Sequence, residues 1–232
     1  MEANKPVLEL ELYLIRHGQS MGNKGYGRDN LTLREMADPV LTDLGKAQAD
    51  ALGKFYATTD FDAVYSSGLL RAAETASRLL AGQEREKTQF ILPYLTEVGM
   101  GEEYKGATLE ELREYNKTIT LAEGFTEADP ILCYSEGRDE DMLYERAKTT
   151  VEYIRKRYNS GEKVALVSHA AYLTYVIFQI MGYQKNPFFD VSVFNTSVTK
   201  INFYKEGTNK YGDVVIDYLN STTHLLELET TN

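Results

Sequence analysis

The hydrophobic and polar positions of the chain alternate between two periods, one typical of strands and one typical of helices. Residues 8–16 alternate at first and then become continuously apolar, as expected of a strand inside a sheet. Residues 43–57 instead carry apolar side chains at helical spacing, and Thr42 before them is a typical helix cap. The same patterns predict, in chain order, a strand at 61–67, a helix at 69–80, a strand at 90–95, a helix beginning at the capping box of 108–111, a helix with Leu143, Ala147, Val151, Ile154 and Tyr158 on one face, a strand at 163–169, a helix at 170–181, and strands at 197–205 and 211–219.

Strands that alternate with helices predict an α/β fold. We expect a three-layer sandwich, with a mostly parallel central sheet and helices on both of its faces. Residues 98–138 are acidic, rich in turn-forming residues and weakly periodic, so we expect an inserted, lid-like excursion over the active site rather than framework. The whole chain, residues 1–232, is then one domain.

Composition and charge narrow the classes of partner. The chain has 25 basic and 35 acidic residues, for a formal charge of −10, a field that repels nucleic acid and anionic lipid. The single cysteine, Cys133, cannot form an internal disulfide, and the first residues lack the pattern of a signal peptide. The longest mostly apolar stretch, residues 170–181, is too short to span a membrane. We therefore expect a cytoplasmic protein with no nucleic-acid or membrane partner; nothing in the sequence indicates an oligomeric state.

Four cationic or titratable side chains follow predicted strands closely: Arg16, His17, Arg71 and His169. Ligands of open α/β sheets bind at the carboxyl ends of the strands, so these side chains are candidates for one site. Two guanidinium groups and two imidazoles would repel one another without an anion between them, and phosphate suits the guanidinium geometry. Zinc is the competing use of the histidines, but it needs a third ligand, and the adjacent arginines disfavour a cation.

The segment Arg16-His17-Gly18, with Ser20 and Asn23, resembles the signature RHGxSxxN of the histidine phosphatases, a superfamily that includes phosphoglycerate mutase. The resemblance covers nearly the whole chain. Further stretches that resemble the family, in order, are LTDLGKAQA (41–49), YSSGLLRAAETA (65–76), LTEVGMGEEYKG (95–106), VALVSHA (164–170) and LNSTTHL (219–225).

This resemblance implies roles for individual residues. His17 would be the nucleophile that becomes a phosphohistidine, while Arg16, Arg71 and His169 would surround the phosphate. Glu97 would protonate the leaving oxygen and later activate water. The implied binding residues are Arg16, Ser20, Asn23, Arg71 and His169, and the resemblance implies no metal and no other cofactor.

Some of these assignments have alternatives. Glu102 and Glu103 lie close to Glu97, and Ser20 and Asn23 could simply cap or turn their loop. Ala170 stands where the family usually has glycine. We give His224 a structural role.

The favoured function is a metal-independent phosphomonoester hydrolase that acts on a small phosphorylated substrate. The segment 24–38 does not resemble the substrate loop of the true mutases, which disfavours a phosphoglycerate mutase. The remaining alternative is a non-catalytic module that binds phosphate.

Overall fold

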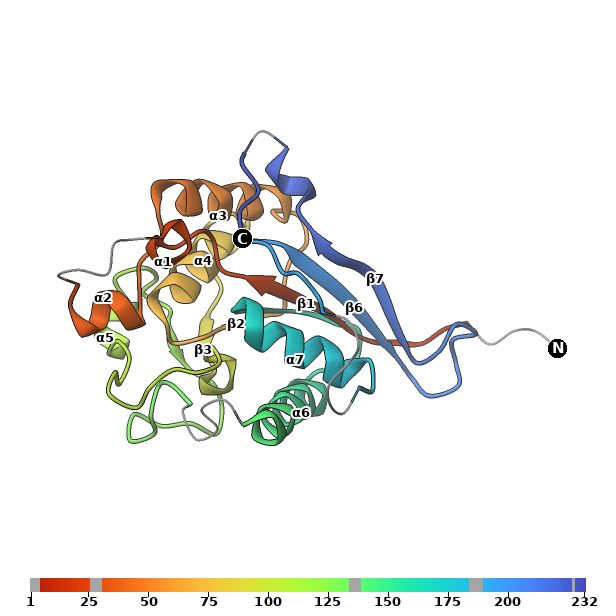
Figure 1. Ribbon diagram of the computed structural model, residues 1–232. Helices are drawn as coiled ribbons and strands as arrows, with labels where there is room; N and C mark the ends of the chain where they lie inside the picture. Colours follow the sequence, from red (N-terminus) through yellow and green to blue (C-terminus); the bar gives the residue numbers. More distant parts are fainter. Residues whose placement is uncertain (1–4, 26–30, 134–138, 184–189, 227) are drawn as a thin grey trace.

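The computed structural model describes residues 5–25, 31–133, 139–183, 190–226 and 228–232 (Figure 1). Part of the segment 24–38, residues 26–30, lies outside the described residues. The elements in chain order are β1 (Leu8–Arg16), α1 (Met21–Lys24), α2 (Leu33–Ala37), α3 (Asp43–Phe55), β2 (Ala63–Ser66), α4 (Leu70–Ala81), β3 (Gln89–Ile91), the 3₁₀ helix η1 (Pro93–Leu95), α5 (Leu109–Leu112), β4 (Thr120–Leu121), α6 (Glu140–Arg157), β5 (Glu162–Ser168), α7 (Ala170–Ile180), β6 (Val198–Tyr204), β7 (Val214–Ser221) and the 3₁₀ helix η2 (Thr223–Leu225).

The strands form one mixed sheet in the order β4-β3-β2-β5-β1-β6-β7. The five strands from β4 to β1 run parallel, whereas β6 and β7 are antiparallel to their neighbours. Helices cover the sheet on both sides (Figure 1), so the predicted α/β sandwich with a mostly parallel sheet is confirmed. None of the described helices is both long and apolar enough to cross a membrane.

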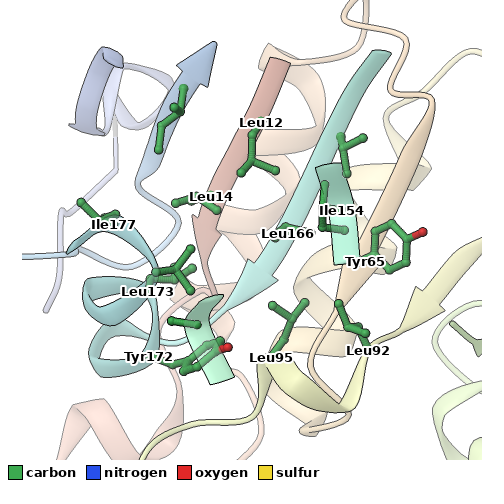
Figure 2. Close-up of a cluster of buried hydrophobic side chains, with 14 of the residues drawn as sticks. Leu12, Leu14, Tyr65, Leu92, Leu95, Ile154, Leu166, Tyr172, Leu173 and Ile177 are labelled. Atoms are coloured by element: carbon green, nitrogen blue, oxygen red, sulfur yellow. The ribbon is translucent and has the colours of Figure 1, made fainter. Parts of the chain in front are cut away.

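The continuous apolar run of β1 is explained by burial on both faces. Leu12 and Leu14 join a cluster with residues of α6 and α7, as Figure 2 shows for Leu173 and Ile177. The alternate side chains of β1, beginning with Tyr13, belong to a second cluster, with residues of α3 and α4. A strand with a helical layer on each face has no solvent-facing side, and its sequence therefore stops alternating.

Strand register positions the candidate residues. Arg16, the last residue of β1, pairs with Ser168, the last residue of β5, so His17 and His169 leave the sheet side by side. On the other side of β5, Ser66 of β2 pairs with Val167, and the chain then runs directly into α4.

The segment 98–138 is less of an excursion than its composition indicates. Leu121 lies in β4, which extends the sheet beside β3, and Leu112 and Ile119 pack in a buried cluster with residues of α4. Of the part of this segment that the structure describes, residues 98–133, a short stretch from Gly99 to Gly101 lines the cavity described below. The apolar residues of this segment lie too far apart along the chain to show a helical or strand period. The sequence therefore predicted surface structure.

Two element boundaries and one whole element also differ from the predictions. The strand predicted at 90–95 ends at Ile91, because Pro93 cannot donate to a sheet and begins a 3₁₀ turn instead. The last strand lies at Val214–Ser221 rather than at 211–219. The helix α2 was not predicted, although Thr32 and Glu35 form a capping box at its start.

Candidate active site

The two histidines lie next to each other at the carboxyl edge of the sheet. Their ring centroids are 5.1 Å apart, and both side chains are buried. The backbone holds His17 at this place: its N–H donates to the carbonyl of Ser168, and its own carbonyl accepts from the Thr196 N–H and the Asn195 side chain. The structure therefore brings together the two histidines that are far apart in the sequence.

The hydrogen bonds of His17 fix which ring nitrogen carries the proton. Nδ1 lies 2.7 Å from the carbonyl oxygen of Gly18, which can only accept, so Nδ1 is the protonated nitrogen. Nε2 is then the unprotonated nitrogen, and its lone pair accepts from the Arg71 Nε–H at 3.3 Å. Burial, followed by the positive charges of Arg71 and Arg16, holds the pKa of His17 well below its ordinary value. The result is a neutral imidazole with a nucleophilic nitrogen.

Arg71 is oriented by Asp38, which sequence reasoning missed. One carboxylate oxygen of Asp38 lies 3.4 Å from Arg71 Nη1, and both oxygens accept from the Leu70 N–H at 2.9 and 3.1 Å. Tyr104 donates its hydroxyl to Asp38 at 2.9 Å. Burial raises the pKa of Asp38, although Arg71 and these donors oppose the shift. Asp38 therefore both caps α4 and holds the guanidinium group.

A signal for Asp38 exists in the sequence, although it is indirect. The residue that caps α4 is Leu69, which has no side chain able to accept a hydrogen bond. A buried helix start needs acceptors for its first N–H groups, so an acceptor from another segment is expected to reach it. The sequence does not say which one.

Arg16 is buried and held by the chain's last segments. Its Nη1 donates to the carbonyl of Val193 at 2.6 Å and to the side-chain oxygen of Asn232 at 2.9 Å. Its Nε is buried and makes no hydrogen bond with the described residues. Burial lowers the pKa of Arg16 to about 10, so the guanidinium group stays charged at neutral pH. Sequence reasoning missed Val193 and Asn232, because nothing near them has a motif.

Glu97, rather than Glu102 or Glu103, lines the cavity beside His17. Its Oε1 accepts from the Val98 N–H at 2.9 Å and from the Tyr172 N–H, in the first turn of α7, at 3.1 Å. These two hydrogen bonds tie the Glu97 side chain to the backbone beside it and to the start of α7. Its second oxygen is left for a ligand.

Arg146 of α6 supports the segment that carries Glu97. It donates to the carbonyl of Tyr94 at 2.9 Å and to that of Thr96 at 2.7 Å. Its guanidinium carbon also lies 3.9 Å from the ring centroid of Tyr172, whose N–H holds Glu97. Arg146 thus fixes both ends of the contact that positions the carboxylate.

Ser20 and Asn23 line the cavity and also cap α1 in a reciprocal capping box. The Ser20 hydroxyl donates to Asn23 Oδ1 at 2.9 Å, and the Asn195 amide donates to the same oxygen at 3.4 Å. Because the oxygen of Asn23 is engaged, its NH₂ group is the part available to a ligand. Both readings of these residues, as cap and as binding group, are compatible with this geometry.

His169 is fully buried and is not among the residues that line the cavity, and neither of its ring nitrogens makes a hydrogen bond with a described residue. Burial and then the charge of Arg71 hold its pKa well below the ordinary value. Buried polar atoms normally have partners, so two unpaired imidazole nitrogens beside His17 indicate a ligand site. Sequence reasoning had identified this residue.

Three other residues raised by the sequence lie outside the cavity. Ala170 lines a neighbouring groove with Thr174 and Val193, so its methyl group is not part of the cavity wall. His224 pairs with the Thr196 hydroxyl at 3.0 Å, which agrees with a structural role. The backbone N–H of Cys133 donates to Thr96, and its side chain is half-buried.

Close backbone packing fixes the loop after His17. A Cβ atom on Gly18 would lie 2.4 Å from the Gly45 carbonyl oxygen, and one on Gly45 would lie 2.0 Å from that of Gln19. Neither position has room for a side chain. The Gly18 N–H donates to the Thr75 hydroxyl, which in turn donates to the carbonyl of Arg71. One hydroxyl thus links the His17 loop to the helix that carries Arg71.

These groups surround a cavity of about 380 Å³ with two arginines, His17 and Glu97 in its wall. Among the described residues, no group of three histidine, cysteine or acidic side chains could hold a metal ion. Two guanidinium groups, a neutral imidazole and a carboxyl group can bind a tetrahedral oxyanion, attack it and exchange a proton with it.

Comparisons with known proteins agree with this geometry. Residues 12–212 match the model of the histidine phosphatase superfamily (branch 1), which confirms the resemblance. The broad-specificity phosphatase YOR283W of Saccharomyces cerevisiae is 26% identical over 93% of this chain and 87% of its own length. Phosphoserine phosphatase 1 of Hydrogenobacter thermophilus is 28% identical over 94% of this chain and 95% of its own. The structure of YhfR from Bacillus stearothermophilus has the same fold, with a TM-score of 0.61 at 23% identity over 93% of this chain and 98% of that one.

Proposed function

The chain belongs to the histidine phosphatase superfamily, and from this membership and the geometry of the site we propose that it is a metal-independent phosphomonoester hydrolase acting through a phosphohistidine on His17. The observation that carries the proposal is the state of His17, which lines the cavity: Nδ1 is protonated and bonded to Gly18, and Nε2 is the unprotonated nitrogen, which accepts from the Arg71 Nε–H. The two full-length curated relatives described above are also phosphatases by name.

The first half of the reaction transfers the phosphoryl group. The Nε2 lone pair of His17 attacks phosphorus while the ester P–O bond breaks and the leaving oxygen takes its electron pair. Arg16 and Arg71 neutralise the phosphoryl oxygens, which is most of what phosphoryl transfer asks of an enzyme. The Arg71 Nε–H, which donates a hydrogen bond to Nε2 in the free site, donates to a phosphoryl oxygen instead. Glu97 gives its proton to the leaving oxygen through Oε2, since Oε1 is held by two backbone N–H groups.

The second half returns the enzyme to its starting state. Water attacks the phosphorus of phosphohistidine, the P–N bond breaks, and His17 recovers its lone pair. Glu97, now a carboxylate, takes the proton of the water. We expect the NH₂ group of Asn23, which Ser20 orients, to donate to the phosphoryl oxygens. His169, buried beside His17, is expected to donate to them as well, as the family resemblance implies. Each group acts from the position that it already holds.

The test uses the full chain with p-nitrophenyl phosphate in EDTA. We expect steady release of phosphate, and an acid-labile, base-stable label after brief reaction with ³²P-labelled substrate. His17→Asn should lose both turnover and label. His224→Gln, which removes a histidine outside the cavity, should still take the label. Loss of activity in EDTA, or normal turnover by His17→Asn, would refute the mechanism.

The same experiment separates the alternatives. A phosphoglycerate mutase would move phosphate between positions of a glycerate with little net release. A binding module would take up phosphate or vanadate without hydrolysing any ester. Either outcome would replace the proposal.

A further inference from the structure

The cavity wall has two zones of different chemistry. The groups that would hold a phosphate gather around His17, whereas the wall beyond them is formed by Met36, Ala37, Pro39 and Met100, with glycines between them. This second zone, the apolar rim, is where the rest of a substrate must lie once its phosphate contacts the two arginines. Its chemistry therefore decides which alcohols the site accepts.

The apolar rim is held in place by the protein core. Ala37 and Met100 pack against a buried cluster of Leu69, Tyr104 and Leu132. Asp38, next to Ala37, accepts the Tyr104 hydroxyl, which ties residues 36–39 to the segment after Met100. The rim is thus formed before any ligand binds.

Met36 is the most exposed part of the rim. Its side chain, at the end of α2, is 50% exposed. Methionine is flexible and polarisable, so it can pack against alcohols of different shapes and against aromatic rings. The half-exposed Met36 side chain therefore offers an apolar surface on which the alcohol part of a substrate can pack.

A single bound phosphate would engage every charged side chain that lines the described part of the cavity wall. Its cations are Arg16 and Arg71, both engaged near His17, and its acidic residue is Glu97. A second carboxylate or phosphate on the substrate would lie against the apolar rim, with no further cation among the described wall residues. The residues that directly follow Gly101, Glu102 and Glu103, are exposed and bring no positive charge to the rim. An unpaired anion that loses water at such a surface is strongly disfavoured.

We infer that the substrates are phosphate monoesters of uncharged, largely apolar alcohols, aromatic ones included, and that esters carrying a second anionic group are rejected. This inference rests on the proposed phosphatase activity. By this inference, the substrates of this chain differ from phosphoserine, an ester that carries a carboxylate and for which one relative is named.

Two esters that differ only at the far end test the preference. Butyl phosphate and 3-(phosphonooxy)propanoate share a primary alkyl leaving group, but the second ends in a carboxylate. We expect kcat/KM to be at least about tenfold higher for butyl phosphate, since the carboxylate finds no countercharge. Equal or reversed values would overturn the inference and leave the hydrolase intact. Failure to hydrolyse any ester would instead refute the proposed function, and the inference with it.

A charge placed in the rim should reverse part of the preference. Met36→Lys should raise kcat/KM for the carboxylated ester relative to butyl phosphate by about fivefold, the size expected of a partly exposed ion pair. Met181→Lys is the matched control, because Met181 is 41% exposed at the far end of α7 and the substitution adds the same charge. An unchanged ratio in Met36→Lys, or an equal shift in Met181→Lys, would show that the apolar rim does not select the substrate.

Discussion

The burial of neutral histidines makes the stability of this protein depend on pH in a way that can be calculated. The pKa of His17 is held well below 6.5 by burial and by the charges of Arg71 and Arg16, so the folded protein keeps it neutral. The unfolded chain protonates the same ring near pH 6.5. Because the unfolded state binds the extra proton, the free energy of unfolding falls as the pH decreases below that value, and the stability is fully present above it. Between pH 7 and pH 5.5 each such histidine removes about 1.2 kcal/mol.

Comparison of wild type with His17→Asn isolates this contribution. The asparagine amide can still donate to the Gly18 carbonyl, so the main hydrogen bond of the side chain is kept. Urea unfolding at pH 7 and pH 5.5 gives the loss of stability for each protein. The loss should be smaller in the variant by about 1.2 kcal/mol. Carboxylates and His224, whose pKa burial lowers to about 4, remain in both proteins and cancel.

A second substitution checks the reasoning independently. His169 is also buried, and its pKa is lowered by the same causes, so His169→Asn should give a similar reduction. Since neither ring is charged at either pH, the two reductions should add in the double variant. If the loss between pH 7 and pH 5.5 were the same in wild type and in His17→Asn, His17 would be protonated in the folded protein. The proposal that the nucleophile is a neutral imidazole would then be wrong.

Three further substitutions test the supports of the site. Gly45→Ala puts a Cβ atom 2.0 Å from the Gln19 carbonyl, so urea unfolding should show a loss of about 1–3 kcal/mol, and phosphate release should fall as the loop after His17 moves. Asp38→Asn removes the charge that orients Arg71, so the free energy of unfolding should fall by about 1–3 kcal/mol and vanadate should inhibit more weakly. Unchanged inhibition would contradict the orienting role of Asp38. Arg146→Met frees the segment that carries Glu97, so kcat should fall about tenfold more for phenyl phosphate than for 2,4-dinitrophenyl phosphate, whose leaving group needs no proton. An equal fall for both esters would make Arg146 merely structural.

The framework of the sheet could be read from the sequence because each central strand is buried on both faces. The apolar run of residues 8–16 and the run before His169 are short and continuous, as is typical of strands buried on both faces. Register then follows from burial, and register alone places His17 beside His169. The residues that depend on strand ends were therefore predictable.

The supports of the site were not predictable in this way. Asp38, Arg146 and Asn232 act through contacts between segments that are distant in the chain, and each has an ordinary surface-like surrounding sequence. The packing of residues 98–138 was missed for a related reason. A strand of two residues, β4, has no period to detect, and only the neighbouring β3 defines it.

The position of the last residues has a practical consequence for every measurement described above. Thr231 donates to the Asn195 side chain, Glu229 accepts from Gln48, and Asn232 accepts from Arg16. In Figure 1 the C-terminus lies close to α3, in agreement with the contact between Glu229 and Gln48. A purification tag fused after Asn232 would begin beside Arg16, and its effect could be mistaken for poor intrinsic turnover.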